Sequence, residues 1–115
     1  LPNHKVTVSR RKTVSEPGLG YIQAFMVKSC VNANAGTMRL GLVDWSAVGR
    51  GGANYDPISV SGYPMLSPSY PGQRTVRAGQ CVRGWLLFET KAKLYYLIYS
   101  NVMVMNADEA SWKIG

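Results

Sequence analysis

The chain has 115 residues, of which 46% are hydrophobic and 17% are charged. This size and balance predict one folded domain over residues 1–115, and they exclude both a second core and a disordered chain. The formal net charge of +7, from 13 basic and 6 acidic residues, indicates attraction to anionic surfaces, although plain solubility explains scattered charges equally well.

No transmembrane segment is expected, because apolar runs such as residues 102–105 are far too short to span a bilayer. The first residues run straight into a strand pattern, without the cationic and then apolar segment of an export leader. A leader was therefore either removed or never present.

The first half of the chain carries recurring strand signals. Residues 5–9 alternate polar and apolar side chains, as a half-buried strand does, and a basic run at 10–12 precedes a break at 16–20. Residues 21–31 form a long apolar-rich stretch that ends in a turn rich in asparagine and glycine. A third strand is predicted over residues 38–45.

The second half alternates loops with further strands. The glycine-rich residues 49–52 are typical of a hairpin loop, since no helix follows to make them a phosphate cradle. Pro57 places the weak strand over residues 54–60 at a sheet edge or a bulge, and residues 61–79 have the composition of an ordered loop. The remaining strands are predicted over residues 80–88, 94–99 and 111–114. About seven short strands indicate an all-β sandwich or barrel.

The two cysteines, Cys30 and Cys81, lie 51 positions apart on predicted strands. Cys30 shares its phase with Lys28, and Cys81 shares its phase with Arg83, so both cysteines fall on solvent-facing phases. If the two strands are neighbours, a disulfide lies across the outer face of one sheet and contributes about 2–4 kcal/mol to stability. Two buried free thiols are the alternative. A disulfide implies an oxidising compartment.

Four stretches share a pattern of strands and turns: residues 25–36 (FMVKSCVNANAG), 42–44 (LVD), 52–55 (GANY) and 79–89 (GQCVRGWLLFE). Together they resemble a family of small extracytoplasmic immunoglobulin-like modules of Gram-positive bacteria. The chain is also similar in size to the small immunogenic protein secreted by mycobacteria, whose last strand contains a tryptophan that Trp112 matches. The resemblance implies an antiparallel immunoglobulin-like sandwich of about seven strands, secreted or attached to the envelope, with no catalytic residues. The proline that usually follows the Phe-acid pair is missing here, which puts only that local turn in doubt.

The inventory of reactive side chains predicts that the protein is not an enzyme. His4 is the only histidine and is expected as an ordinary surface residue in a mobile tail, so no nucleophilic triad and no zinc site are expected. Asp44 and Asp56 are the best carboxylate pair, but strand capping and turn formation explain them better than acid–base catalysis. The pair also supplies too few oxygens for calcium. We expect no catalytic residue, no metal and no cofactor.

The long loop that carries Tyr63 and Tyr70 is the candidate binding site, and two interpretations of it are open. With Tyr55 and Trp45, these tyrosines form an aromatic contact patch for a protein or glycan partner. Alternatively, the loop covers a sheet edge and prevents edge-to-edge pairing.

Two functions follow from these observations. The first is a non-enzymatic binding or interaction domain, secreted or on the extracellular side of the cell envelope, whose partner is a protein or an anionic wall or envelope polymer. The second is a basic OB-like barrel that binds nucleic acid, with Trp85 and Arg83 on one face. The plainer role for Trp85 is to shield the disulfide or to pack along arginine stems. Export and a disulfide defeat the second function, so nucleic acid is not the expected partner.

Overall fold

The regular structure of the described residues consists of β-strands and short 3-10 turns. The computed structural model describes residues 3–18, 20–59, 63–101 and 108–115. The described strands are β1 (His4–Glu16), β2 (Gly20–Val31), β3 (Thr37–Leu40), β4 (Trp45–Gly49), β5 (Asn54–Tyr55), β6 (Arg74–Arg77), β7 (Cys81–Glu89), β8 (Leu94–Asn101) and β9 (Asp108–Lys113). The 3-10 turns are η1 (Leu42–Asp44), η2 (Arg50–Gly52) and η3 (Pro64–Leu66). No helix among these residues is long and apolar enough to cross a membrane.

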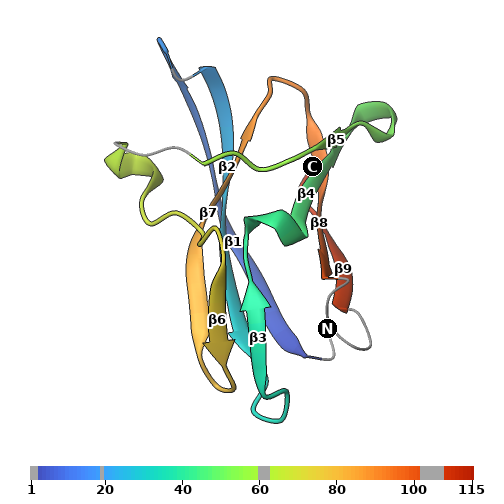
Figure 1. Cartoon of the computed structure of the whole chain (residues 1–115). Coiled ribbons are helices and arrows are strands. Elements are labelled where there is room, and N and C mark those ends of the chain that lie inside the picture. Colours follow the sequence, from blue (N-terminus) through green and yellow to red (C-terminus); the bar gives the residue numbers. More distant parts are fainter. Residues whose placement is uncertain (1–2, 19, 60–62, 102–107) are drawn as a thin grey trace.

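The described strands form three antiparallel sheets, consistent with an immunoglobulin-like β-sandwich, in which antiparallel sheets pack face to face around one core. Their strand orders are β1-β2-β7, β3-β6 and β5-β4-β8-β9. Figure 1 shows the long strands of the first sheet facing β4, β8 and β9 across the core, with β3 and β6 at one end of the molecule. All three sheets contribute to that core, from Phe25 of β2 to Leu40 of β3 and Leu97 of β8. The sandwich expected from the sequence is therefore confirmed.

The alternation expected in β2 and β7 is also confirmed. Val82, Leu86 and Phe88 of β7 point into the main core, whereas Trp85 and Leu87 belong to a second cluster on the outer face of the sheet. Side chains of a strand alternate between its two faces, so a strand that is apolar on both faces needs another part of the protein to shield each face from water. The cover on the outer face comes from the long loop described below.

The predicted strand over residues 38–45 is wrong, because the chain leaves one sheet and enters another within it. β3 ends at Leu40, the turn η1 follows, and β4 begins at Trp45. A side chain at Gly41 would collide with the backbone carbonyl of Gly72, so the switch occurs where two chain segments approach closely. The predicted strand over residues 54–60 is likewise shortened to β5.

A β-bulge in β1 changes which face of the strand points inward. Val8 pairs with Val27, but the next partner, Met26, pairs with Arg10, so Ser9 is the extra residue. Before the bulge, even-numbered residues such as Val6 pack against the main core. After it, even-numbered residues such as Val14 pack against the outer cluster instead. The basic run at residues 10–12 therefore continues β1 and does not end it.

Candidate functional site

Two of the four aromatic residues predicted for a contact patch lie in the main core. Trp45 is only 2% exposed and Tyr70 only 1% exposed. Their rings meet edge to face with centroids 6.1 Å apart, and Tyr99 contacts Trp45 with centroids 5.3 Å apart. This burial corrects the expectation of a surface patch that includes Trp45 and Tyr70, because large aromatic side chains next to an open core position gain most by filling it.

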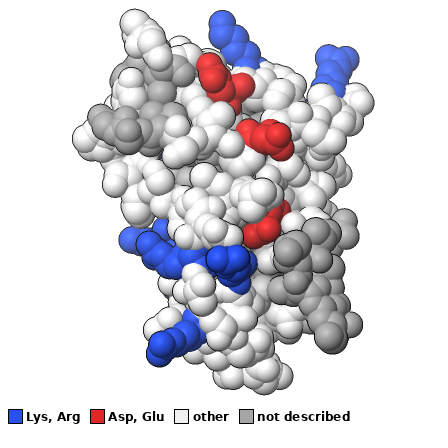
Figure 2. All heavy atoms as spheres, in the orientation of Figure 1, with Lys and Arg blue, Asp and Glu red and all other residues white. Residues whose placement is uncertain are grey.

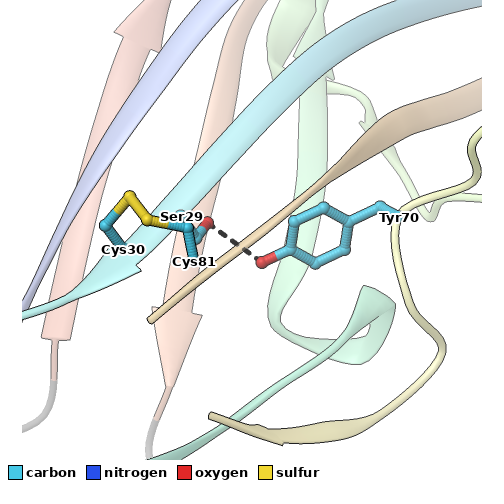
Figure 3. Close-up of a disulfide and its surroundings, with 4 residues drawn as sticks. All are labelled: Ser29, Cys30, Tyr70 and Cys81. Atoms are coloured by element: carbon cyan, nitrogen blue, oxygen red, sulfur yellow. Dashed lines mark hydrogen bonds between the residues drawn. A yellow bond between two sulfur atoms is a disulfide. The ribbon is translucent and has the colours of Figure 1, made fainter. Parts of the chain in front are cut away.

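The hydroxyl of Tyr70 is satisfied inside the core. It lies 3.0 Å from the Oγ atom of Ser29, and either oxygen can donate the hydrogen bond (Figure 3). Burial raises the pKa of Tyr70 above its ordinary value, while the interactions with Ser29 and Trp45 act in the opposite direction and Asp44 adds a small increase. The buried Nε1 atom of Trp45 has no hydrogen-bond partner of standard geometry among the described residues.

Tyr55 and Tyr63 are half-buried and lie on different sides of the first sheet. Tyr55 packs against the main core, and Tyr63 packs against the outer cluster with Trp85. The four predicted residues therefore do not form one surface in the structure.

The loop that carries Tyr63 and Tyr70 covers the free edge of β7. The amide of Ile58 donates to Leu87 O at 2.8 Å, and the amide of Trp85 donates to Pro68 O at 2.9 Å. Tyr70 N donates to Trp85 O at 3.2 Å, and a side chain at Gly84 would collide with this backbone. These backbone hydrogen bonds correspond to the second interpretation of the loop, protection of a sheet edge.

The two cysteines form a disulfide between directly paired residues of neighbouring strands. Cys30 of β2 pairs with Cys81 of β7, and their Cα atoms are 4.0 Å apart. Cys81 is exposed and Cys30 is half-buried, on the side of the sheet opposite to Ser29 and Tyr70 (Figure 3). The predicted bridge across the outer face of one sheet is confirmed. The two buried thiols considered as the alternative are not found.

A group of basic side chains surrounds this disulfide, and we call it the basic face. Lys28 pairs directly with Arg83, and Lys5 pairs directly with Cys30, so all three cations share the outer face with the disulfide. All three side chains are exposed. The basic face also includes Arg10 and Lys12, which follow the bulge on β1 and lie on the same side.

Arg10 and Lys12 mark the end of the basic face nearest the covering loop. The guanidinium carbon of Arg10 lies 5.8 Å from the Trp85 ring centroid, and Lys12 Nζ lies 5.0 Å from it. Lys12 Nζ also donates to Met65 O at 2.7 Å. Trp85 therefore packs beneath cationic stems, which is the plainer of the roles expected for it.

Acidic residues with described side chains lie away from the basic face. Asp44 belongs to η1, Asp56 follows β5, and Glu89 is six positions from Arg83 along β7, which corresponds to roughly 20 Å. Figure 2 shows another group of Lys and Arg over β3 and β6, with one acidic group directly beside it and the other acidic groups farther up the same view. Arg39, Arg74 and Arg77 are the exposed basic residues of those two strands.

The histidine and the aspartate considered for reactive roles lie where packing and burial explain them. His4 begins β1 and is only 1% exposed, with its ring 4.7 Å from that of Tyr99, so the expected mobile surface histidine is wrong. Asp44 lines a cavity of about 150 Å³ with Arg39 and Asn101, and burial raises its pKa despite a hydrogen bond from the Gly41 backbone. No second carboxylate lines this cavity in the described part of the chain. No cluster of three or more metal-ligating side chains occurs there either.

The sequence pattern missed the basic face as a unit. Lys28 and Arg83 were recognisable as solvent-facing from alternation alone. Lys5 joins them only because of strand pairing, and Arg10 and Lys12 join only because of the bulge. Residues 10–12 lie within β1, and the alternation that resumes after them toward Val14 was the available signal that the strand extends past the basic run.

Comparison with known proteins finds the same fold in a secreted protein of Mycobacterium tuberculosis, MPT63. Its crystal structure matches with a TM-score of 0.69 and 17% sequence identity, over 96% of this chain and 82% of that chain. At this identity the likeness concerns the fold. No protein-family model matches the sequence, and no curated protein matches it significantly.

Proposed function

We propose that the protein is a non-enzymatic, exported domain that binds an anionic polymer of the cell envelope through the basic face. The observation that carries this proposal is the direct pairing of two exposed cations, Lys28 and Arg83, beside the disulfide. Like charges directly opposite one another on a sheet destabilise it. A bound polyanion removes that repulsion, so the arrangement favours a ligand with several negative charges.

The disulfide supports both parts of the proposal. Disulfides persist in oxidising compartments outside the cytosol, and Cys81 is exposed to any reductant in its surroundings. The bridge also joins β2 and β7 on the same face, two positions along the strands from the repelling pair. It holds the two strands together at the position where charge repulsion would separate them.

The fold likeness to MPT63 is consistent with export, because that neighbour is a secreted protein. The OB-like barrel considered as the alternative is not the architecture found, since the described strands form three separate sheets. Nucleic acid remains useful as a competitor in the binding experiment, because its phosphates share the charge of envelope polymers.

Calorimetric titration with poly(glycerol phosphate), compared with an uncharged polymer of the same length, tests the proposal. Lys28→Glu converts the repelling pair into an attractive one and is expected to weaken binding about tenfold at low salt. Arg50→Glu, in the exposed turn η2, changes the net charge equally and is expected to have little effect. Raising the ionic strength is expected to weaken binding of the unaltered protein.

Two results would overturn the proposal. Equal losses in Lys28→Glu and Arg50→Glu would mean that only net charge matters, and tighter binding of single-stranded DNA than of poly(glycerol phosphate) would favour the nucleic-acid function. The compartment is tested separately by mass measurement of protein from its native source. Two free thiols there would remove the argument for export.

A further inference from the structure

A groove runs between the free edges of two strands that belong to different sheets. Among the described strands, β1 pairs only with β2 and β9 pairs only with β8. Each therefore keeps one edge without a neighbouring strand. Figure 1 shows the start of β1 and β9 beside each other at the lower right of the molecule. We call the space between them the β1–β9 groove.

Two cavities lie along this groove, and both are lined by the same pair of strands. The first has a volume of about 320 Å³ and is lined by residues that include Val8, Arg11 and Trp112. The second has a volume of about 290 Å³ and is lined by residues that include Val6, Ser111 and Trp112. Because Trp112 lines both cavities, the two are consecutive parts of one groove.

A side chain, and not a strand ladder, bridges β1 and the residues after β9. Arg11 Nη1 donates to Ile114 O at 3.0 Å, while the Ile114 amide donates to Tyr95 O of β8 at 2.8 Å. No backbone hydrogen bond joins β1 to β9 among the described residues. In the described part of the chain, the edges of β1 and β9 that face the groove are therefore not joined by a strand ladder, which is the arrangement that strand addition requires.

The groove combines an apolar floor with basic walls. Val6, Val8 and Trp112 are partly buried and pack against the main core. The charged residues that line the two cavities are basic: Lys5, Arg10, Arg11 and Lys113. No described lining residue is acidic.

We propose that the β1–β9 groove binds an extended acidic peptide segment of a partner protein, which adds as a strand to the free edge of β1. Backbone hydrogen bonds along an edge supply affinity, and pockets for alternate side chains supply specificity. The apolar floor receives one set of side chains, and the basic walls pair with carboxylates on the others. The groove shares Lys5 and Arg10 with the basic face along β1, but Trp112 and Lys113 line the groove alone, and the proposal does not depend on the function of the basic face.

A second copy of the chain is a poor occupant of the same groove. A copy would bring the same basic residues against Lys5, Arg10 and Lys113, and each chain carries a net charge of +7. Like charges across an interface disfavour association. Sedimentation of the purified protein is therefore expected to give a monomer, and a stable dimer that blocks the peptide would contradict the proposal.

The peptide experiment uses the unaltered protein. The probe is a dye-labelled eight-residue peptide of alternating glutamate and valine, and binding is followed by fluorescence anisotropy. A version with lysine in place of glutamate tests charge. A version with alternate backbone nitrogens methylated tests strand pairing, because methylation removes the donors. We expect binding of the acidic peptide, at least tenfold weaker binding of the methylated version, and none of the lysine version.

Two outcomes of these titrations would overturn the proposal. Equal binding of the methylated peptide would mean that no strand is added. A lack of binding by the acidic peptide at millimolar protein would mean that the groove does not accept such a segment. Amide chemical shifts provide the location, since changes are expected in β1 and β9. Changes confined to the strands around Cys81 would place the peptide on the basic face instead.

A matched pair of variants separates this proposal from the one above. Lys113→Glu is expected to weaken peptide binding about tenfold and to leave binding of poly(glycerol phosphate) unchanged. Lys28→Glu is expected to do the reverse, and Lys91→Glu, an exposed control, is expected to change neither. If Lys113→Glu fails to fold, the methylated peptide still decides the question on the unaltered protein. Loss of both ligands in Lys113→Glu would contradict separate sites.

Discussion

The two ends of the outer face of the β1-β2-β7 sheet have opposite designs. At one end, Ile22, Trp85 and Leu87 point outward and are buried beneath the loop that contains Leu66. At the other end, the outward residues are cations and the disulfide, and the face is open. The same strands and the same side-chain phase serve both ends. The loop therefore covers the end of the face where the outward side chains are apolar and leaves open the end where they are charged.

The two ends are also stabilised by different physical means. The covered end is held by burial of apolar area, which is worth roughly 25 cal/mol per Å². The open end has exposed Lys28 and Arg83 directly opposite one another, and a covalent bond holds the strands. This difference makes the effects of mutations at the two ends distinguishable in size and in sign.

Removal of the disulfide is expected to have the largest effect. Replacing both Cys30 and Cys81 by alanine opens a loop closed across 51 positions and should lower the free energy of unfolding by about 4 kcal/mol. Urea unfolding of the variant and of the unaltered protein measures the difference. A loss below about 1 kcal/mol would mean that other contacts hold the open end.

The covered end is tested by Leu66→Ala, which is expected to lower stability by about 3 kcal/mol. Leu66 is only 1% exposed and fills the outer cluster, so its truncation leaves a cavity. Its neighbour Met65 is 38% exposed, and Met65→Ala is the matched control with an expected effect below about 0.5 kcal/mol. Equal effects of the two substitutions would mean that the loop does not seal the cluster.

Tyr70→Phe tests how much the hydrogen bond between the loop and the core side of the same sheet contributes to stability. Loss of the hydrogen bond to Ser29 is expected to lower stability by about 1 kcal/mol at neutral pH. The pKa of Tyr70 is raised in the folded state, so the unfolded chain loses the phenol proton first. The contribution of Tyr70 is therefore full below pH 10.0 and is lost as the pH rises through the raised pKa. Thermal unfolding at neutral and at alkaline pH measures this loss. The decrease in stability between the two pH values is expected to be smaller for Tyr70→Phe than for the unaltered protein.

Lys28→Glu has the smallest expected effect on stability, and its sign is the informative part. An attractive pair with Arg83 should raise the unfolding free energy by a few tenths of a kcal/mol, after allowance for solvent screening. Chemical denaturation at low salt measures this gain. A variant that is both less stable and weaker in polymer binding would indicate damage to the sheet. The loss of binding would then not be evidence that the charge of Lys28 contacts the polymer.

Alternation along β2 and β7 was sufficient to predict the disulfide and its outer face. The phases of Lys28 and Arg83 are local properties of a strand, and Cys30 follows the same phase. The sandwich itself also follows from the spacing of short strands and turns.

The positions of Trp45, Tyr70 and His4 could not be predicted in the same way. Aromatic and imidazole side chains suit both a surface and a core, and the choice depends on which segments meet across the sandwich. Tyr70 is buried because its loop crosses Gly84, a contact between residues far apart in sequence. The basic face required strand pairing and a bulge that no alternation pattern reveals.

Ser9 lets β1 place valines and cations on opposite faces although all of them stand at even positions. Val8 packs against the main core and Arg10 lies on the outer face, because the extra residue resets the side-chain phase between them. Deleting Ser9 would make Val8 and Arg10 consecutive and would leave both on their present faces, since consecutive residues of a regular strand alternate. Straightening the bulge with Ser9 retained would instead turn one side of the strand over. Along a lineage, the chain can therefore lose this residue in one step, but it cannot keep the residue and lose the bulge.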